Sequence, residues 1–139
     1  MPLVGLISIT TNSAGNVDFE YDVVDDDNFK TAQDKGFTYR KLLCMAFDLA
    51  VLINYHDESY FRFVYHDDAF ANEDNRIKQR LLSVIREICT GYNLQYICSV
   101  IQDELPRDEA GQLVEFPANE VILQLHDQDD SGKLFLRTF

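Results

Sequence analysis

The sequence predicts a mixed α/β domain, in which short strands alternate with two long amphipathic helices. Of its 139 residues, 46 % are hydrophobic and 12 % aromatic, and no low-complexity tract interrupts them. A strand–helix–strand succession lies at the centre of the chain, between residues 61 and 101. Ten Phe and seven Tyr without any Trp favour sheet-rich packing. A chain of this length can bury one core, so we expect a single domain over residues 1–139.

The N-terminal region predicts a β-hairpin. Residues 3–10 are rich in β-branched and aliphatic side chains, and residues 12–15 (Asn-Ser-Ala-Gly) form a turn sequence. Residues 17–23 then alternate apolar and acidic side chains with a period of two, which is typical of a half-buried strand.

The spacing of apolar residues predicts two helices. Residues 38–55 repeat apolar side chains at i, i+3 and i+4 with others between them, which predicts a helix buried on most sides. The second helix runs over residues 72–90, with Asn72 as N-cap and Gly91 as the residue that ends it.

Strands flank the second helix at residues 61–65 and 94–101. A right-handed crossover makes such strands parallel neighbours. Asp67 and Asp68 then lie at the carboxyl edge of the sheet, where open α/β sheets place ligands. Residues 120–125 and 134–137 predict a last antiparallel hairpin.

The charge of the chain limits its partners. The chain has a net charge of −12 and a pI near 4.4, so its negative field repels the phosphates of nucleic acid. Any contact with DNA is therefore expected to be indirect. Three Cys without metal-ligand spacing predict buried free thiols in a reducing cytoplasm. The longest apolar run, residues 42–53, is too short to span a bilayer and contains Asp48. We therefore expect a cytoplasmic protein with no membrane contact.

The acid pair carries the clearest chemical signal. Because successive residues of a strand point to opposite faces, one acid of the pair Asp67–Asp68 can reach a metal ion while the other aims at a water molecule. Mg²⁺ favours a few protein carboxylates together with phosphates and waters. The alternative is a pair of surface acids that opens a loop. His66 can bind a phosphate or a water, or serve as a structural residue at the strand end, and Asp74 can simply favour a helix N-terminus.

No phosphate-cradling loop accompanies these acids. Ser131-Gly132-Lys133 looks like part of a P-loop, but the preceding Gly is missing and Leu134 replaces the Ser or Thr that binds Mg²⁺. The combination of a strand-end acid pair with no phosphate loop suggests one half of a nucleotide-hydrolysing machine.

The run from Phe63 to Asp74 resembles the Walker B strand and D-loop of the C-terminal lobe of ABC-type ATPases of the SMC, RecN and RecF kind. The resemblance implies that Asp67 binds Mg²⁺, that Asp68 replaces the catalytic Glu, and that Asp74 is the D-loop Asp. More narrowly, the chain resembles an uncharacterised bacterial family at the C-terminal end of long coiled-coil ATPases, through the motifs Phe-Asp-Leu-Ala, His-Asp, Tyr-Ile-Cys and Gly-Lys-Leu-Phe.

The same resemblance assigns three further positions. Lys35 and Gly36 precede the first helix where the signature loop would lie, without its Ser-Gly-Gly core. Gln102, or Ile101 by a shift of one residue, stands where the switch residue would follow the last strand.

The resemblance implies a C-terminal ATPase lobe that uses Mg²⁺ and ATP only in the assembled head. An N-terminal lobe of the same or a partner chain would supply the P-loop, and two heads would close into a dimer in a DNA-associated machine. Alone, the chain should not hydrolyse ATP. Two alternatives remain: a non-catalytic interaction domain, and a Mg²⁺-dependent nuclease or phosphatase that uses Asp25 with Asp67 and Asp68.

Overall fold

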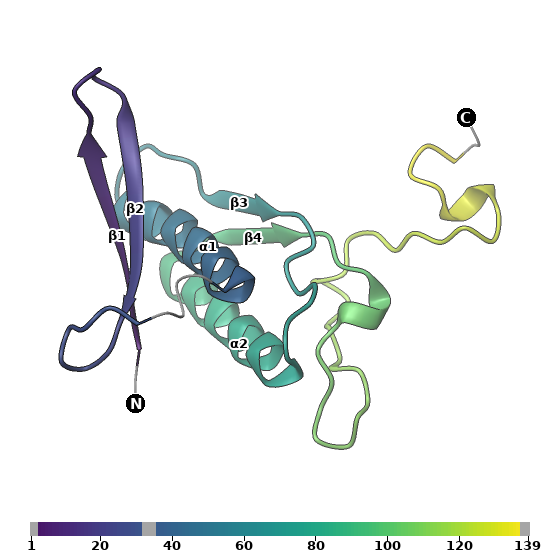
Figure 1. Ribbon diagram of the computed structural model, residues 1–139. Coiled ribbons are helices and arrows are strands. Elements are labelled where there is room, and N and C mark those ends of the chain that lie inside the picture. Colours follow the sequence, from purple (N-terminus) through teal and green to yellow (C-terminus); the bar gives the residue numbers. More distant parts are fainter. Residues whose placement is uncertain (1–2, 32–35, 137–139) are drawn as a thin grey trace. The chain divides into compact units, whose positions relative to one another are not determined.

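The fold is mixed α/β, with one small antiparallel sheet and one small parallel sheet. A computed structural model describes residues 3–31 and 36–136 (Figure 1). By its internal contacts the chain divides into two compact units, Met1–Pro106 and Arg107–Phe139. This division concerns contact density alone, so the single domain over residues 1–139 stays a prediction.

The predicted N-terminal hairpin is confirmed. Strand β1 (Val4–Thr11) pairs antiparallel with strand β2 (Val17–Val24). In the turn, the Oδ1 atom of Asn12 accepts hydrogen bonds from two backbone N–H groups, and Gly15 adopts a left-handed φ of 83°. One face of the hairpin contacts the first helix, since the rings of Phe19 and Phe47 meet edge to face at 5.7 Å.

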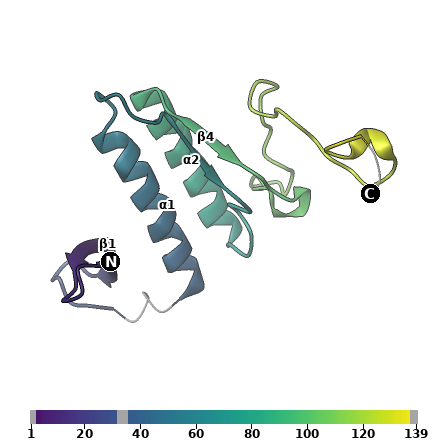
Figure 2. The same cartoon turned by 90° about the horizontal axis from the view of Figure 1, so that it is seen from above.

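Helices α1 (Phe37–Asn54) and α2 (Asn75–Tyr92) lie side by side in both views (Figures 1 and 2). Helix α1 fully buries only Met45, Leu49 and Leu52, whereas Ala46 and Ala50 are exposed. The prediction that this helix is buried on most sides is therefore wrong for the described residues. Its apolar surface is wider than the part of the chain that covers it.

Both predicted ends of α2 are shifted. Asp74 is the N-cap, and its side chain accepts a hydrogen bond from the N–H of Arg76; Asn72 instead lies in the preceding loop with a φ of 58°. At the other end, Gly91 is inside the helix and Asn93 ends it in the left-handed conformation. Asn adopts that conformation more readily than most residues, so the helix can run past its glycine.

The predicted parallel pairing is confirmed. Strand β3 (Phe63–His66) pairs with strand β4 (Gln95–Cys98), and His66 lies opposite Cys98. Val64 and Tyr96 face a core that is built from both helices and from Ala69 in the loop after β3.

The other face of this sheet is open. Phe63 and Tyr65 are 50 % and 55 % exposed, and Phe61, just before the strand, is 65 % exposed. Strand β3 is therefore packed on one face only. Figures 1 and 2 show why, because α1 and α2 both pack on the side that Val64 and Tyr96 occupy.

The second unit contains no strand among its described residues, 107–136, so the predicted last hairpin is wrong. Asp130–Gly132 forms a 3₁₀ helix, and a single backbone bond from His126 to Gly132 closes this loop at 2.9 Å. The apolar side chains that were expected to pair across the hairpin are exposed, with Ile122 at 81 %. A two-stranded hairpin needs a packed face to be stable, and these side chains have none within the unit.

The three Cys are free, but Cys44 and Cys98 are exposed, so their predicted burial is wrong. Among the described residues, neither α1 nor α2 has the length and hydrophobicity that a transmembrane helix needs.

The shifted end of α2 gives a matched pair of stability predictions. We expect Gly91→Ala to raise the free energy of unfolding by about 1 kcal/mol, since a Cβ there meets no atom within 4 Å and alanine favours a helix interior. Asn93→Ala should lower it by about 1 kcal/mol, because alanine disfavours the left-handed conformation. Urea denaturation measures both. Destabilisation by Gly91→Ala would show that the helix ends at Gly91.

Candidate functional site

The acid pair and Ser99 meet at the carboxyl edge of the parallel sheet. Asp67 and Asp68 follow β3, and Ser99 follows β4. The Ser99 hydroxyl donates a hydrogen bond to the Oδ1 atom of Asp67 and accepts one from the backbone N–H of Asp68 at 3.2 Å. The Tyr65 hydroxyl lies 3.4 Å from the same Asp67 oxygen. One hydroxyl thus joins the ends of the two strands.

Sequence reasoning missed Ser99 and chose Gln102 as the polar residue after the last strand. The signal that could have found it is the strand register. Because His66 pairs with Cys98, the next residues along each strand, Asp67 and Ser99, come opposite each other. Gln102 instead begins a 3₁₀ helix, Gln102–Glu104, and is exposed.

Asp68 lies at the sharp bend after β3. Its φ is 53°, a left-handed conformation that Asp and Asn adopt more readily than longer side chains. Its Oδ1 atom is buried and accepts no hydrogen bond from any described residue. A buried carboxylate oxygen without a partner is costly. It marks a position where a bound water, a cation or a donor group would be stabilised.

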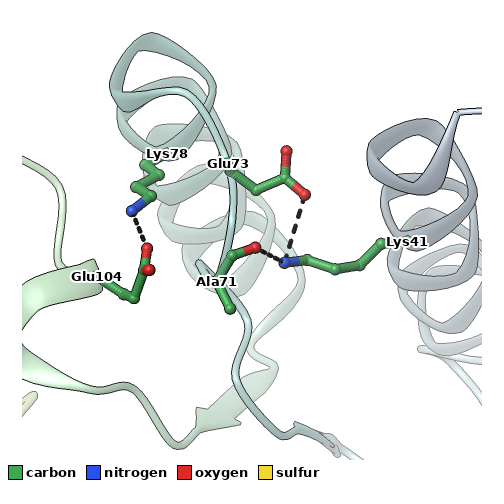
Figure 3. A network of polar contacts seen from close by, with 5 residues as sticks. All are labelled: Lys41, Ala71, Glu73, Lys78 and Glu104. Atoms are coloured by element: carbon green, nitrogen blue, oxygen red, sulfur yellow. Dashed lines mark hydrogen bonds and ion pairs between the residues drawn. The ribbon is translucent and has the colours of Figure 1, made fainter.

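The loop between the acid pair and α2 buries four of its six residues, 69–71 and 73. Phe70 is 2 % and Ala69 1 % exposed. Lys41 on α1 holds the loop from one side (Figure 3), where its Nζ atom donates to the backbone oxygen of Ala71 at 2.8 Å. The same Nζ lies 3.4 Å from the Oε1 atom of Glu73, whose side chain is fully buried. Lys41 therefore satisfies a loop carbonyl and lies beside a buried acid, although neither Glu73 side-chain oxygen accepts a hydrogen bond from the described residues.

A second ion pair joins α2 to the segment after β4 (Figure 3). The buried Lys78 donates a short hydrogen bond to Glu104, which also accepts one from the backbone N–H of Asn72. The hydrogen bond from Lys78 holds the pKa of Glu104 below its ordinary value. Glu104 thus connects α2, the loop and the segment after β4.

His66 has a structural role at the strand end. One ring nitrogen lies 2.9 Å from Asp48 on α1, and the other lies 2.9 Å from the hydroxyl of Tyr96 on β4. Burial raises the pKa of Tyr96, so this phenol stays neutral. Both ring nitrogens are engaged, which favours the structural interpretation over direct binding of a phosphate.

The remaining predicted site residues lie on separate elements. Asp74 is the N-cap of α2 and belongs to the same loop as the acid pair, whereas Gly36 is the N-cap of α1. Lys35 lies outside the described residues. Asp25 uses its Oδ1 atom to close its own turn, accepting from the N–H groups of Asp27 and Phe29. The roles assigned to these residues stay predictions.

The acid pair fits a cation only in part. Carboxylate oxygens are the ligands that Mg²⁺ prefers, and Asp67 and Asp68 supply them. Over residues 3–31 and 36–136, however, no three His, Cys, Asp or Glu side chains form a group that could hold a metal ion. Asp25 therefore does not join the acid pair among the described residues, and the nuclease or phosphatase alternative stays a prediction. A cation here would take its other ligands from water, a nucleotide or another lobe.

Fold and site together define a mixed α/β protein with an acid pair at the carboxyl edge of its parallel strands. A family model described as "Uncharacterised protein conserved in bacteria (DUF2326)" matches residues 4–139. The chain belongs to this family. No curated protein matches the sequence.

The ion pair between Lys78 and Glu104 predicts a dependence of stability on pH. Because the folded-state pKa of Glu104 lies below its ordinary value of 4.5, the pair stabilises fully above that value. Its contribution is lost as pH falls through the lower folded-state value. In Lys78→Met we expect the pKa of Glu104 to rise towards 4.5 and this part of the acid destabilisation to disappear.

NMR titration of the Glu104 carboxyl carbon and urea denaturation at several pH values measure the two effects. Lys30→Met is the control, because Lys30 forms an exposed ion pair with Asp22 on the hairpin. An unchanged pKa of Glu104 in Lys78→Met would contradict the prediction.

Proposed function

We propose that this chain is the C-terminal lobe of an SMC-like ABC ATPase head. The observation that carries the proposal is the placement of Asp67, Asp68 and Ser99 at the carboxyl edge of two parallel strands, followed by a buried loop that leads to Asp74. The strand, acid pair, loop and helix come in the order that the Walker B and D-loop elements of such lobes have. The contacts of Lys41 with Ala71 and Glu73 support the view that the position of the loop matters.

Each residue has a proposed role in hydrolysis. Mg²⁺, when bound with ATP, would offset the charge that develops on the phosphates. Asp67 would hold the ion, with Ser99 fixing one of its carboxylate oxygens. Asp68, whose Oδ1 atom is without a partner, would orient or deprotonate the attacking water. Gln102, beyond β4, is proposed to sense the γ-phosphate.

Lys35 and Gly36 are proposed to approach the γ-phosphate bound to a second head, and Asp74 to lie at the seam between the heads. These assignments rest on the resemblance of the sequence. They require a head-to-head dimer, and any contact with DNA would come from other parts of the assembly, since this chain has a net charge of −12.

The open sheet supports the idea that another lobe completes the fold. Parallel sheets are normally covered on both faces, whereas Phe63 and Tyr65 leave one face of β3–β4 half exposed. A two-stranded sheet also leaves an outer edge unpaired on each strand. We propose that an N-terminal lobe with the P-loop binds here, in the cytoplasm, to form the complete head.

Mg²⁺-dependent ATP turnover tests the proposal. We expect no ATP turnover from this chain alone. We expect turnover from the full-length protein that contains it. Asp67→Asn should lower that turnover by about 100-fold or more, because the carboxylate that holds the ion is lost. Asp18→Asn, the same substitution at an exposed acid on the hairpin, should leave it unchanged.

The outcomes separate the candidate functions. Phosphoester hydrolysis by the chain alone would overturn the split-site proposal. Turnover by the full-length protein that is insensitive to Asp67→Asn would remove the acid pair from the mechanism. If the full-length protein neither binds nor hydrolyses ATP, the chain is better explained as an interaction domain, whose open aromatic face then serves a different partner.

A further inference from the structure

A groove between the two helices lies apart from the acid pair. It has a volume of about 540 Å³, is open to solvent, and is lined by Leu42 on α1 and by five residues of α2: Arg76, Ile77, Arg80, Leu81 and Val84. Ile77, Leu81 and Val84 follow one another at i, i+4 and i+7, so they form a continuous apolar stripe along α2. Arg76 and Arg80, one position before Ile77 and Leu81, flank this stripe.

The two arginines differ from every other basic residue that the structure describes. The chain has 24 acidic and 12 basic residues, so a cation has abundant carboxylates to choose from. Lys30, Lys41, Lys78 and Lys133 all form ion pairs. The other described arginines also make polar or cation–π contacts.

Within residues 3–31 and 36–136, neither the Arg76 nor the Arg80 guanidinium makes a hydrogen bond or an ion pair, and both residues are exposed. In an acidic chain, the two unpartnered arginines thus stand together beside one apolar groove. Their spacing of four residues separates them by about 6 Å along the helix axis.

We propose that this groove binds an amphipathic helix of a partner protein, with an apolar stripe against Leu42, Ile77, Leu81 and Val84 and two carboxylates that pair with Arg76 and Arg80. Charge complementarity sets the partner's chemistry. The carboxylates would lie four residues apart on the partner helix, to match the two guanidinium groups. This surface does not depend on the proposed ATPase function.

The apolar lining of the groove suits an amphipathic helix better than a polar ligand. The stripe of Ile77, Leu81 and Val84 gives α2 a ridge against which the apolar face of another helix can pack. Nucleic acid is disfavoured, because the floor of the groove is apolar and the chain carries a net charge of −12.

Two synthetic peptides test the proposal. Each has about 18 residues, enough for roughly five helical turns, and carries Leu at i, i+4 and i+7. One peptide has two Glu four residues apart beside this stripe, and the other has two Lys at the same positions. The methyl NMR signals of Leu42, Ile77, Leu81 and Val84 report where each peptide binds, and fluorescence anisotropy reports its affinity.

We expect the Glu peptide to shift these methyl signals and to bind at least about tenfold more tightly than the Lys peptide. This order opposes the net charge of the chain, which by itself favours the Lys peptide. Arg76→Glu with Arg80→Glu should reverse the order. The control, Lys30→Glu with Arg62→Glu, changes the net charge equally and should keep it. Circular dichroism shows whether each variant is folded. If the double variant unfolds, Arg80→Gln alone replaces it, and we expect this variant to bind the Glu peptide more weakly.

Three outcomes would overturn the proposal: equal affinity for both peptides, methyl shifts outside the groove, or no shift at these four residues at millimolar peptide. A titration with decanoate, a small amphiphile, tests the alternative ligand. If it shifts the four methyl signals while the Glu peptide does not, the groove takes a small amphiphile and the helix proposal is wrong.

Discussion

The structure depends on burying a polar loop without leaving its backbone unsatisfied. The segment after the acid pair contains a fully buried phenylalanine and a fully buried glutamate, so it cannot rely on water for its hydrogen bonds. Lys41 on α1 donates a hydrogen bond to one loop carbonyl, and Glu104 after β4 accepts one from a loop N–H. Lys78 in turn forms an ion pair with Glu104. The helices, the parallel strands and the strand-end acids are all positioned relative to this loop.

Local sequence patterns were enough to predict most of the first unit. Alternation revealed β2, and helical spacing revealed α1 and α2 to within a few residues. Chain order and crossover handedness gave the parallel pairing of β3 and β4, and with it the location of Asp67 and Asp68. These features depend on neighbours in sequence or on general rules of topology.

What the sequence could not reveal depends on distant neighbours. Nothing in the local sequence around Lys41 or Glu73 indicates that the fold brings the two side chains together. Ser99 reaches Asp67 only because of the exact register of β3 and β4, and a shift of one residue would separate them. The failed C-terminal hairpin has the opposite cause. Its strand patterns are locally sound, but the described residues of its own unit leave its apolar side chains exposed.

The bend at Asp68 connects backbone conformation with the identity of the acid. A left-handed φ of 53° favours a short side chain such as Asp over Glu. An Asp at this position is therefore compatible with a tight turn at the strand end. The shorter side chain keeps its carboxylate near the sheet edge, where the Oδ1 atom is buried and accepts no hydrogen bond from the described residues.

The unpaired strand edges also have a colloidal consequence. Each edge can template the strands of another copy, so folded monomers carry a latent tendency to self-associate. A net charge of −12 opposes this tendency by keeping copies apart. That repulsion acts over about 30 Å at an ionic strength of 0.01 M but only about 8 Å at physiological salt. The solubility of the isolated chain is therefore set by a balance that dissolved ions control.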